Sequence, residues 1–134
     1  MALEPSQDLS SIAERLAWEA QHRPQRGVTA EQVFAAFDRA GVPVRGQRQY
    51  LGVTMQAGYC AGGVTLEGIA ISVCEYTSPE AAEAGRRFME RRFAAMTPHA
   101  KRVLHGPTLL SITRPSADTG TEIATRAALT FTSL

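Results

Sequence analysis

Residues 49–76, QYLGVTMQAGYCAGGVTLEGIAISVCEY, decide the fold of this chain. From residue 51 to residue 60 apolar side chains occupy every second position, and residues 69–74 repeat the same period. A two-residue period is typical of strands with one buried face, and glycines between two such runs supply a turn. The stretch therefore predicts an antiparallel hairpin with its connection somewhere in residues 61–68.

The position of the turn decides what the two cysteines do. A turn near Glu67 and Gly68 places Cys60 opposite Cys74, within bridging distance. A tight turn at Gly62-Gly63 separates them and leaves both thiols reduced. A structural disulfide and a pair of ordinary buried thiols are thus both compatible with the pattern, and a disulfide would indicate an oxidising compartment.

Helical patterns flank the hairpin on both sides. Apolar residues recur at three- and four-residue spacing, as on the buried face of a helix. Thr29 and Gln32 form a capping box, while Ser78 followed by Pro79 is a second N-terminal signal. The predicted helices span about 8–21, 30–40, 79–97 and 121–130, and a further strand spans 102–114 with a bend at Gly106-Pro107.

This order of elements predicts an α+β domain. An antiparallel hairpin followed by a helical crossover gives a two-layer sandwich, an antiparallel sheet of three to four strands with helices packed on one face. This arrangement is ferredoxin-like, built on a split βαβ unit. Residues 28–134 form the domain, residues 1–27 form an amphipathic helix and linker, and a fourth short strand is expected around 42–45.

Composition excludes several classes of protein. The chain has 134 residues, of which 44% are hydrophobic and 20% charged, and its net charge is +1. These values exclude a wholly disordered chain and the basic excess of a nucleic-acid-binding protein. No apolar run reaches the length of about 18 residues that a membrane-spanning helix needs. The start, MALEPSQD, does not read as a signal peptide, which fits a cytoplasmic protein or the mature part of an exported one.

Motifs for catalysis or cofactor binding are absent from the sequence. There is no nucleophile elbow, phosphate-binding loop, dinucleotide fingerprint or CxxC pair, so we expect no enzyme activity, no cofactor and no metal site. Glu75 stands out because it follows Ile71 and Val73 on the buried side of a strand. With Tyr59 and Tyr76 it forms the candidate ligand pocket, although a glutamate at a strand end is ordinarily structural.

A cluster of basic residues follows the hairpin. Glutamates at four-residue spacing from Arg86 and Arg87 favour a salt-bridged, solvated helix face. The alternative is a basic patch for an acidic partner or a phosphate-rich surface. That patch would consist of Arg86, Arg87, Arg91, Arg92, Lys101 and Arg102.

The motifs GYCAGG at 58–63 and VCEY at 73–76 resemble those of small bacterial envelope proteins, many of them lipoproteins. The resemblance begins at Val28 and continues through the third helix to residues 108–110. It implies a Cys60–Cys74 pair and an extracytoplasmic location, and it implies no activity. We therefore expect a non-enzymatic envelope domain that binds a protein partner or a second copy of itself. The alternative is a small-molecule or metal-binding domain that uses the space between sheet and helices.

Overall fold

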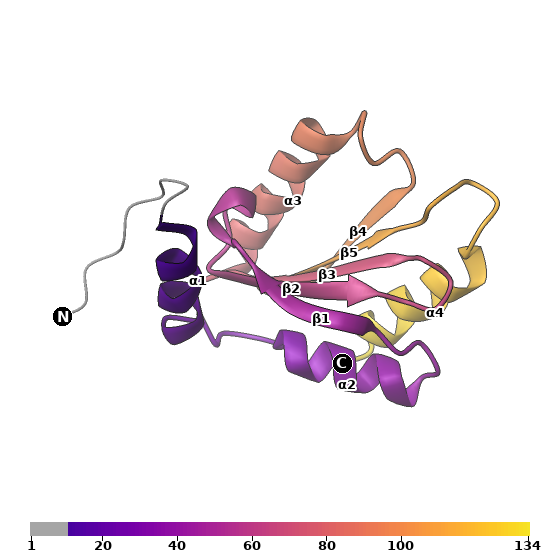
Figure 1. Ribbon diagram of the computed structural model, residues 1–134, viewed down its shortest axis with the longest axis horizontal. Coiled ribbons are helices and arrows are strands. Elements are labelled where there is room, and N and C mark those ends of the chain that lie inside the picture. The colour runs from indigo at the N-terminus through magenta and orange to yellow at the C-terminus, as the bar shows by residue number, and fades with distance from the viewer. Residues whose placement is uncertain (1–10) are drawn as a thin grey trace.

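The computed structural model describes residues 11–134, which form a five-stranded antiparallel sheet with helices on both faces (Figure 1). The α-helices are α1 (Ile12–Gln21), α2 (Ala30–Arg39), α3 (Pro79–Phe93) and α4 (Thr121–Thr132). The strands are β1 (Arg45–Tyr50), β2 (Tyr59–Val64), β3 (Ala70–Glu75), β4 (Ala100–His105) and β5 (Thr108–Thr113), and a 3₁₀ helix, η2, spans Val53–Met55. The strand order is β1-β2-β3-β5-β4.

The α+β class is confirmed, and the sheet is larger than predicted. It has five strands rather than three to four. β3 and β4 run parallel on either side of β5 and are joined by α3, which makes one split βαβ unit. The observed strand order does not confirm a ferredoxin-like topology.

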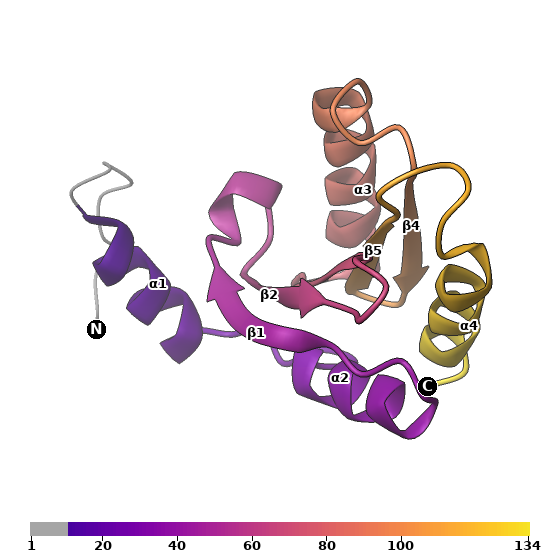
Figure 2. The same ribbon diagram turned by 45° about the vertical axis from the view of Figure 1, so that its right-hand side comes forward.

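The prediction that all helices pack on one face is wrong. α2 and α4 cover one face of the sheet, and α3 lies on the opposite face (Figures 1 and 2). The physical reason is that the second face also carries a short apolar row. Cys60, Cys74 and Leu109 lie side by side on it, and Ala82 and Met89 of α3 pack against them.

The larger core lies between the sheet and the α2–α4 layer. Phe37 of α2 and Phe131 of α4 are fully buried there. They pack against alternate residues of the central strands, among them Ile71, Val73 and Leu110. The side chains at every second residue of β3 and those on one face of α2 therefore pack in the same core.

Two helices begin where their capping residues predict. The Thr29 hydroxyl accepts a hydrogen bond from the Gln32 amide, and the Gln32 side chain accepts one from the Thr29 amide, as a capping box requires. Ser78 caps α3, with Pro79 at its first position. The first helix begins at Ile12, and the predicted residues 8–10 lie outside the described part of the chain.

Two predicted strands are divided in the structure. Residues 51–58 form η2 and its flanking turns, because the buried Glu19 carboxylate accepts hydrogen bonds from the amides of Gly52 (2.7 Å) and Val53 (3.0 Å). These contacts also hold α1 against the domain. The predicted bend at Gly106-Pro107 is a complete turn between β4 and β5, since Gly106 adopts a positive φ of 56°. The short strand expected at 42–45 is instead β1, at 45–50.

Candidate functional site

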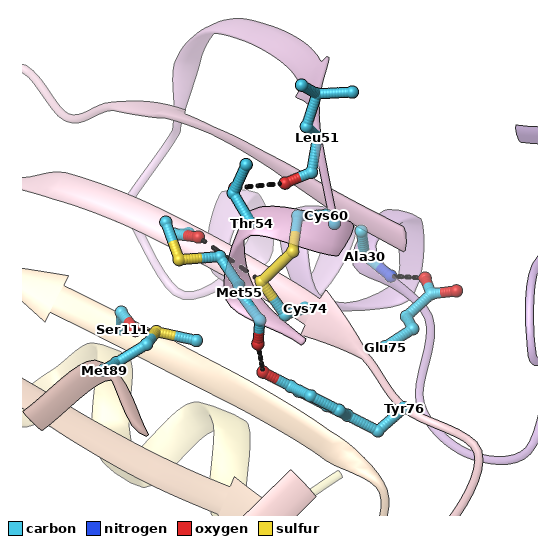
Figure 3. The surroundings of a disulfide bond; sticks show 12 residues. Ala30, Leu51, Thr54, Met55, Cys60, Cys74, Glu75, Tyr76, Met89 and Ser111 are labelled. Atoms are coloured by element: carbon cyan, nitrogen blue, oxygen red, sulfur yellow. Dashed lines mark hydrogen bonds between the residues drawn. A yellow bond between two sulfur atoms is a disulfide. The ribbon is translucent and has the colours of Figure 1, made fainter. Parts of the chain in front are cut away.

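Cys60 and Cys74 form a disulfide across β2 and β3, as the resemblance implied (Figure 3). The turn between the strands lies at Thr65–Gly68, so the later of the two candidate turns is the one formed. Both cysteines are fully buried, at 0% and 1% exposure, under α3. A bridge so enclosed serves to hold the hairpin rather than to exchange with thiols in solution.

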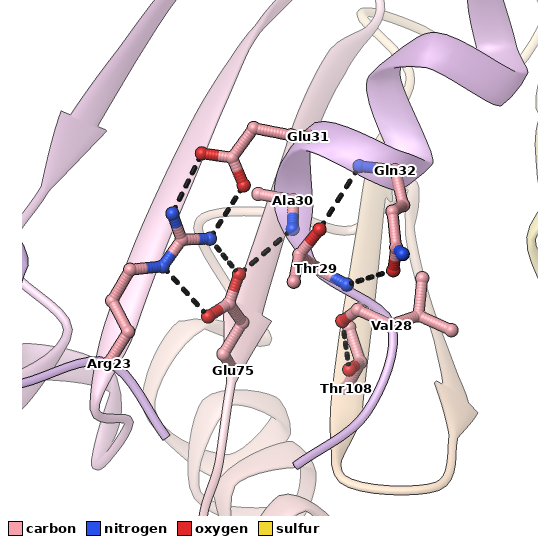
Figure 4. Close-up of polar contacts among 8 residues, drawn as sticks. All are labelled: Arg23, Val28, Thr29, Ala30, Glu31, Gln32, Glu75 and Thr108. Carbon is pink, nitrogen blue, oxygen red and sulfur yellow. Dashed lines mark hydrogen bonds and ion pairs between the residues drawn. The ribbon is translucent and has the colours of Figure 1, made fainter. Parts of the chain in front are cut away.

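The Glu75 carboxylate is part of a polar clamp at the end of β3 (Figure 4). It is buried, and it accepts hydrogen bonds from the Arg23 guanidinium and, at 2.9 Å, from the Ala30 amide at the start of α2. The same guanidinium donates two bonds of 2.7 Å to Glu31 and lies 3.9 Å from the centre of the Tyr59 ring. All of these groups are satisfied by one another, and together they fasten the linker and α2 to the sheet.

The three candidate pocket residues do not share one cavity. Tyr59 and Glu75 lie on the α2–α4 side of the sheet, where Arg23 covers them. Tyr76 packs in the cluster under α3, and its hydroxyl donates to the Met55 carbonyl at 2.8 Å. Burial raises the pKa of Tyr76 above the ordinary range. That the three residues bind a ligand together stays a prediction, and the geometry gives it no support.

The six residues of the predicted basic patch are likewise spread over different surfaces. Arg86 is paired with Glu83 and Glu90 along α3, so this part of the helix is a salt-bridged face. On β4, Lys101 lies opposite Ile112 and Arg102 opposite Ser111, so neighbouring residues point to opposite sides of the sheet. Arg87, Arg91 and Arg92 are exposed on α3.

A groove lies on the part of the sheet that α3 leaves open. α3 contacts mainly β4 and β5, and beside it the face formed by β1, β2 and β3 holds a groove of about 510 Å³. No acidic residue is among the described residues that line it. The polar lining residues are Arg45, Arg48, Tyr50, Ser72, Ser111 and Thr113.

The shape of the groove comes from small residues on β2, β3 and β5 and from Tyr50, whose side chain lies over Gly62. A Cβ atom at Gly62 would lie 2.0 Å from the Tyr50 hydroxyl oxygen, so only glycine lets the Tyr50 side chain lie across β2. Burial raises the pKa of Tyr50 above its ordinary value of 10.0. Ser72 and Ser111 continue the floor on β3 and β5.

Sequence reasoning missed this groove. Its members lie on strands whose pairing follows from the turn at residues 65–68 and from an irregularity between Arg45 and Arg48 in β1. The available signal was the alternation of β3, in which Ala70, Ser72 and Cys74 form a face of small residues.

In comparisons with known proteins, no protein-family model, no curated protein and no solved structure matches the chain. Within residues 11–134, no three histidine, cysteine or acidic side chains gather as metal ligands would. None of the helices described there has the length and apolar character needed to cross a membrane.

Proposed function

We propose that this chain is a non-enzymatic extracytoplasmic domain that binds a protein partner through the groove beside α3. The observation that carries the proposal is the unequal covering of the sheet. One face is closed by two helices, whereas on the other α3 covers only the disulfide end and strands β4 and β5 and leaves a groove of about 510 Å³. A sheet face left open in this way is a common docking surface for another chain.

The disulfide supports the extracytoplasmic part of the proposal. Structural disulfides persist in secreted and periplasmic proteins and are rare in the cytosol. The Cys60–Cys74 bridge also stiffens β2 and β3, which together form the centre of the groove floor. A floor that is rigid before binding reduces the entropy lost on association.

The alternative function is the binding of a small molecule in the same groove. Its supporting observation is the groove volume, which lies within the range of about 300–1,000 Å³ found for ligand pockets. Partner binding is preferred because the groove is open along one side rather than enclosed, and because two arginines stand at its β1 rim.

A photo-cross-linking experiment in cells tests the proposal. Val64 lines the groove and is 46% exposed, whereas Leu129 on α4 is 62% exposed on the other side of the sheet. Each is replaced in turn by p-benzoylphenylalanine. We expect a discrete protein adduct, or a dimer of the chain, from Val64 and none from Leu129. Adducts from Leu129 alone, or from neither position, would reject the groove as the partner-binding surface.

Intact mass under denaturing, non-reducing conditions tests the compartment. Protein isolated from its native source should weigh about two daltons less than the reduced chain, because the bridge lacks two hydrogen atoms. A fully reduced mass would remove the support for an extracytoplasmic location.

A further inference from the structure

A pocket of about 260 Å³ lies on the side of the sheet away from the groove, between α4 and the strands β4 and β5, which Figure 2 shows side by side. His99, Lys101 and Arg114 line it from the sheet, and Thr121 and Thr125 line it from α4. No acidic residue is among the described residues that form its wall. The pocket therefore has a basic lining with hydroxyl groups on one side, a composition that suits an anion.

The strand register brings the three basic side chains together. Lys101 lies opposite Ile112, a residue of the α2–α4 core, so both point to the same side of the sheet. The Arg114 amide donates to the His99 carbonyl at 3.3 Å, which continues the register beyond the last pair of β4 and β5. Directly opposite side chains have Cβ atoms about 5 Å apart, and diagonal neighbours lie about 7–8 Å apart. One small anion can thus contact His99, Arg114 and the diagonal Lys101 together.

Arg114 is held in place and still has hydrogen-bond donors for a ligand. Its Nη1 donates to the carbonyls of Ser116 at 3.1 Å and Ala117 at 2.8 Å, in the loop before α4. The same nitrogen donates to the Thr121 hydroxyl oxygen at 3.3 Å. Within residues 11–134 the hydrogen bonds of this side chain all use Nη1, which leaves Nε and Nη2 for an anion. A guanidinium fixed in this way loses little entropy on binding.

Lys101 and Arg114 form an uncompensated pair of positive charges. Lys101 is exposed and Arg114 is half-buried, and no described carboxylate lies within 4 Å of either side chain's nitrogens. Like charges on neighbouring positions of a sheet repel each other. A bound anion between the two side chains would therefore stabilise this arrangement.

We propose that this pocket binds a phosphate group, carried either by free phosphate or by a small phosphate monoester. The site is separate from the groove, so the proposal goes beyond partner binding. A phosphate presents several oxygens, to which Arg114 donates through two N–H groups, Lys101 through its ammonium and Thr121 through its hydroxyl. The volume of about 260 Å³ lies below the range of about 300–1,000 Å³ that holds drug-sized ligands, so a small anion fits it best.

Larger polyanions fit the pocket less well. Aromatic side chains are absent from the described residues that line it, whereas single-stranded nucleic acids are bound largely by stacking. A lipid surface is recognised by a cluster of basic residues over a broader face. The single basic residue of α4, Arg126, is instead paired with Glu122 at 3.1 Å.

An NMR titration of the full chain tests the proposal. Uniformly ¹⁵N-labelled protein is titrated with sodium phosphate, glycerol 3-phosphate or sodium acetate at about pH 7.5, where phosphate groups are mostly dianions. Sodium chloride keeps the ionic strength constant. We expect the amide signals of Lys101, Arg114 and Thr121 to move with both phosphate compounds and less with acetate. Tighter binding of glycerol 3-phosphate would identify a monoester site, and equal or tighter binding of phosphate would identify a site for the free ion.

Lys101→Gln should raise the dissociation constant for phosphate about fivefold, because it removes one of the charges that hold the dianion. Lys101→Arg keeps this charge and should bind within about twofold of the parent protein. Arg91→Gln is the matched control, since Arg91 is exposed on α3, on the other side of the sheet, and it should leave the dissociation constant unchanged. Both positions are exposed, so all variants should keep the melting temperature of the parent protein.

Equal binding of acetate and phosphate, signal changes away from the pocket, or equal effects of Lys101→Gln and Arg91→Gln would overturn the proposal. Sedimentation with phosphatidic-acid vesicles, without a response to either soluble phosphate compound, would overturn it in favour of a membrane surface. These results are independent of the groove, because cross-linking at Val64 tests the opposite face of the sheet.

Discussion

The two faces of the sheet are built from the same strands but differ in how far they are buried and in the size of their side chains. On the α2–α4 side, β2, β3 and β5 contribute Ala61, Ile71, Val73, Leu110 and Ile112, none more than 7% exposed. On the α3 side the neighbouring positions carry glycine, alanine, serine and threonine, except at the buried disulfide end. The two-residue period of a strand thus lets one sequence encode stability on one face and an open surface on the other.

The largest expected effect comes from the closed face. Phe37 is fully buried between α2 and the sheet, and replacing it with alanine removes most of a phenyl ring from the core. We expect Phe37→Ala to lower the free energy of unfolding by about 4 kcal/mol in urea denaturation.

Val64→Ala on the groove side is the control for this prediction. Since Val64 is 46% exposed, its truncation should cost less than about 0.5 kcal/mol. Similar losses for the two variants would mean that the groove is covered in solution and that the faces do not differ.

The disulfide gives the next largest effect. Cys60 and Cys74 are 14 residues apart, and closing a loop of this length stabilises the native state by about 3 kcal/mol. The Cys60→Ala/Cys74→Ala variant should lose about that amount, with a further loss from the emptied sulfur positions.

Chemical reduction of the parent protein separates the two contributions, because it breaks the bridge and leaves the sulfur atoms in place. Mild reductant should act only under unfolding conditions, since both sulfurs are buried. Rapid reduction of the folded protein would show that α3 opens readily.

Local signals in the sequence predicted the elements better than their assembly. The caps at Thr29 and Ser78 depend on residues within three positions, and both helices begin where those residues place them. Residues 51–58 were predicted as a strand because their apolar residues alternate. That pattern does not reveal that Glu19, more than thirty residues earlier, captures two of their amides.

The candidate site shows the same limit. Whether Cys60 lies opposite Cys74 depends on the position of one turn, so the sequence narrowed the pairing of this hairpin to two registers. The groove beside α3 depends on the pairing of β1 with β2, which is irregular between Arg45 and Arg48, and on the pairings of β2 with β3 and of β3 with β5. These pairings are set by tertiary structure, so the residues that line the groove share no common signal along the chain.

A third prediction concerns the clamp that closes the edge of the covered face. Arg23→Met leaves the buried Glu75 carboxylate with only the Ala30 amide as a described partner. Loss of a charged partner at a buried site is strongly destabilising, and we expect a cost of about 2 kcal/mol because solvent reaches this edge of the sheet. Chemical denaturation measures it.

Arg26→Met is the control, because Arg26 is an exposed arginine of the same linker. It should change the free energy of unfolding by less than about 0.5 kcal/mol. Equal effects of the two variants would show that the linker is not held by Glu75.

The smallest effect distinguishes the exposed Arg23–Glu31 pair of the clamp from the buried Arg23–Glu75 pair. Glu31 is 64% exposed, so water screens its pair with Arg23, and Glu31→Gln should cost only about 0.5 kcal/mol at pH 7. The hydrogen bonds from Arg23 lower the pKa of Glu31 below its ordinary value of 4.5. A lowered folded-state pKa means that the pair stabilises the protein above the unfolded value and that this stabilisation disappears as the pH falls through the lower folded value.

The parent protein and the Glu31→Gln variant should therefore converge in urea midpoint only once the pH has fallen below the lowered folded-state pKa of Glu31, where both side chains are neutral. Glu67→Gln, in the exposed turn between β2 and β3, should follow the parent protein at every pH, since Glu67 has no ion-pair partner among the described residues. A difference between the parent protein and Glu31→Gln that does not shrink as the pH falls below 4.5 would mean that Glu31 acts through packing rather than charge. In that case the Arg23–Glu31 contact would stabilise the protein through packing, as the buried core does, and not through its charges.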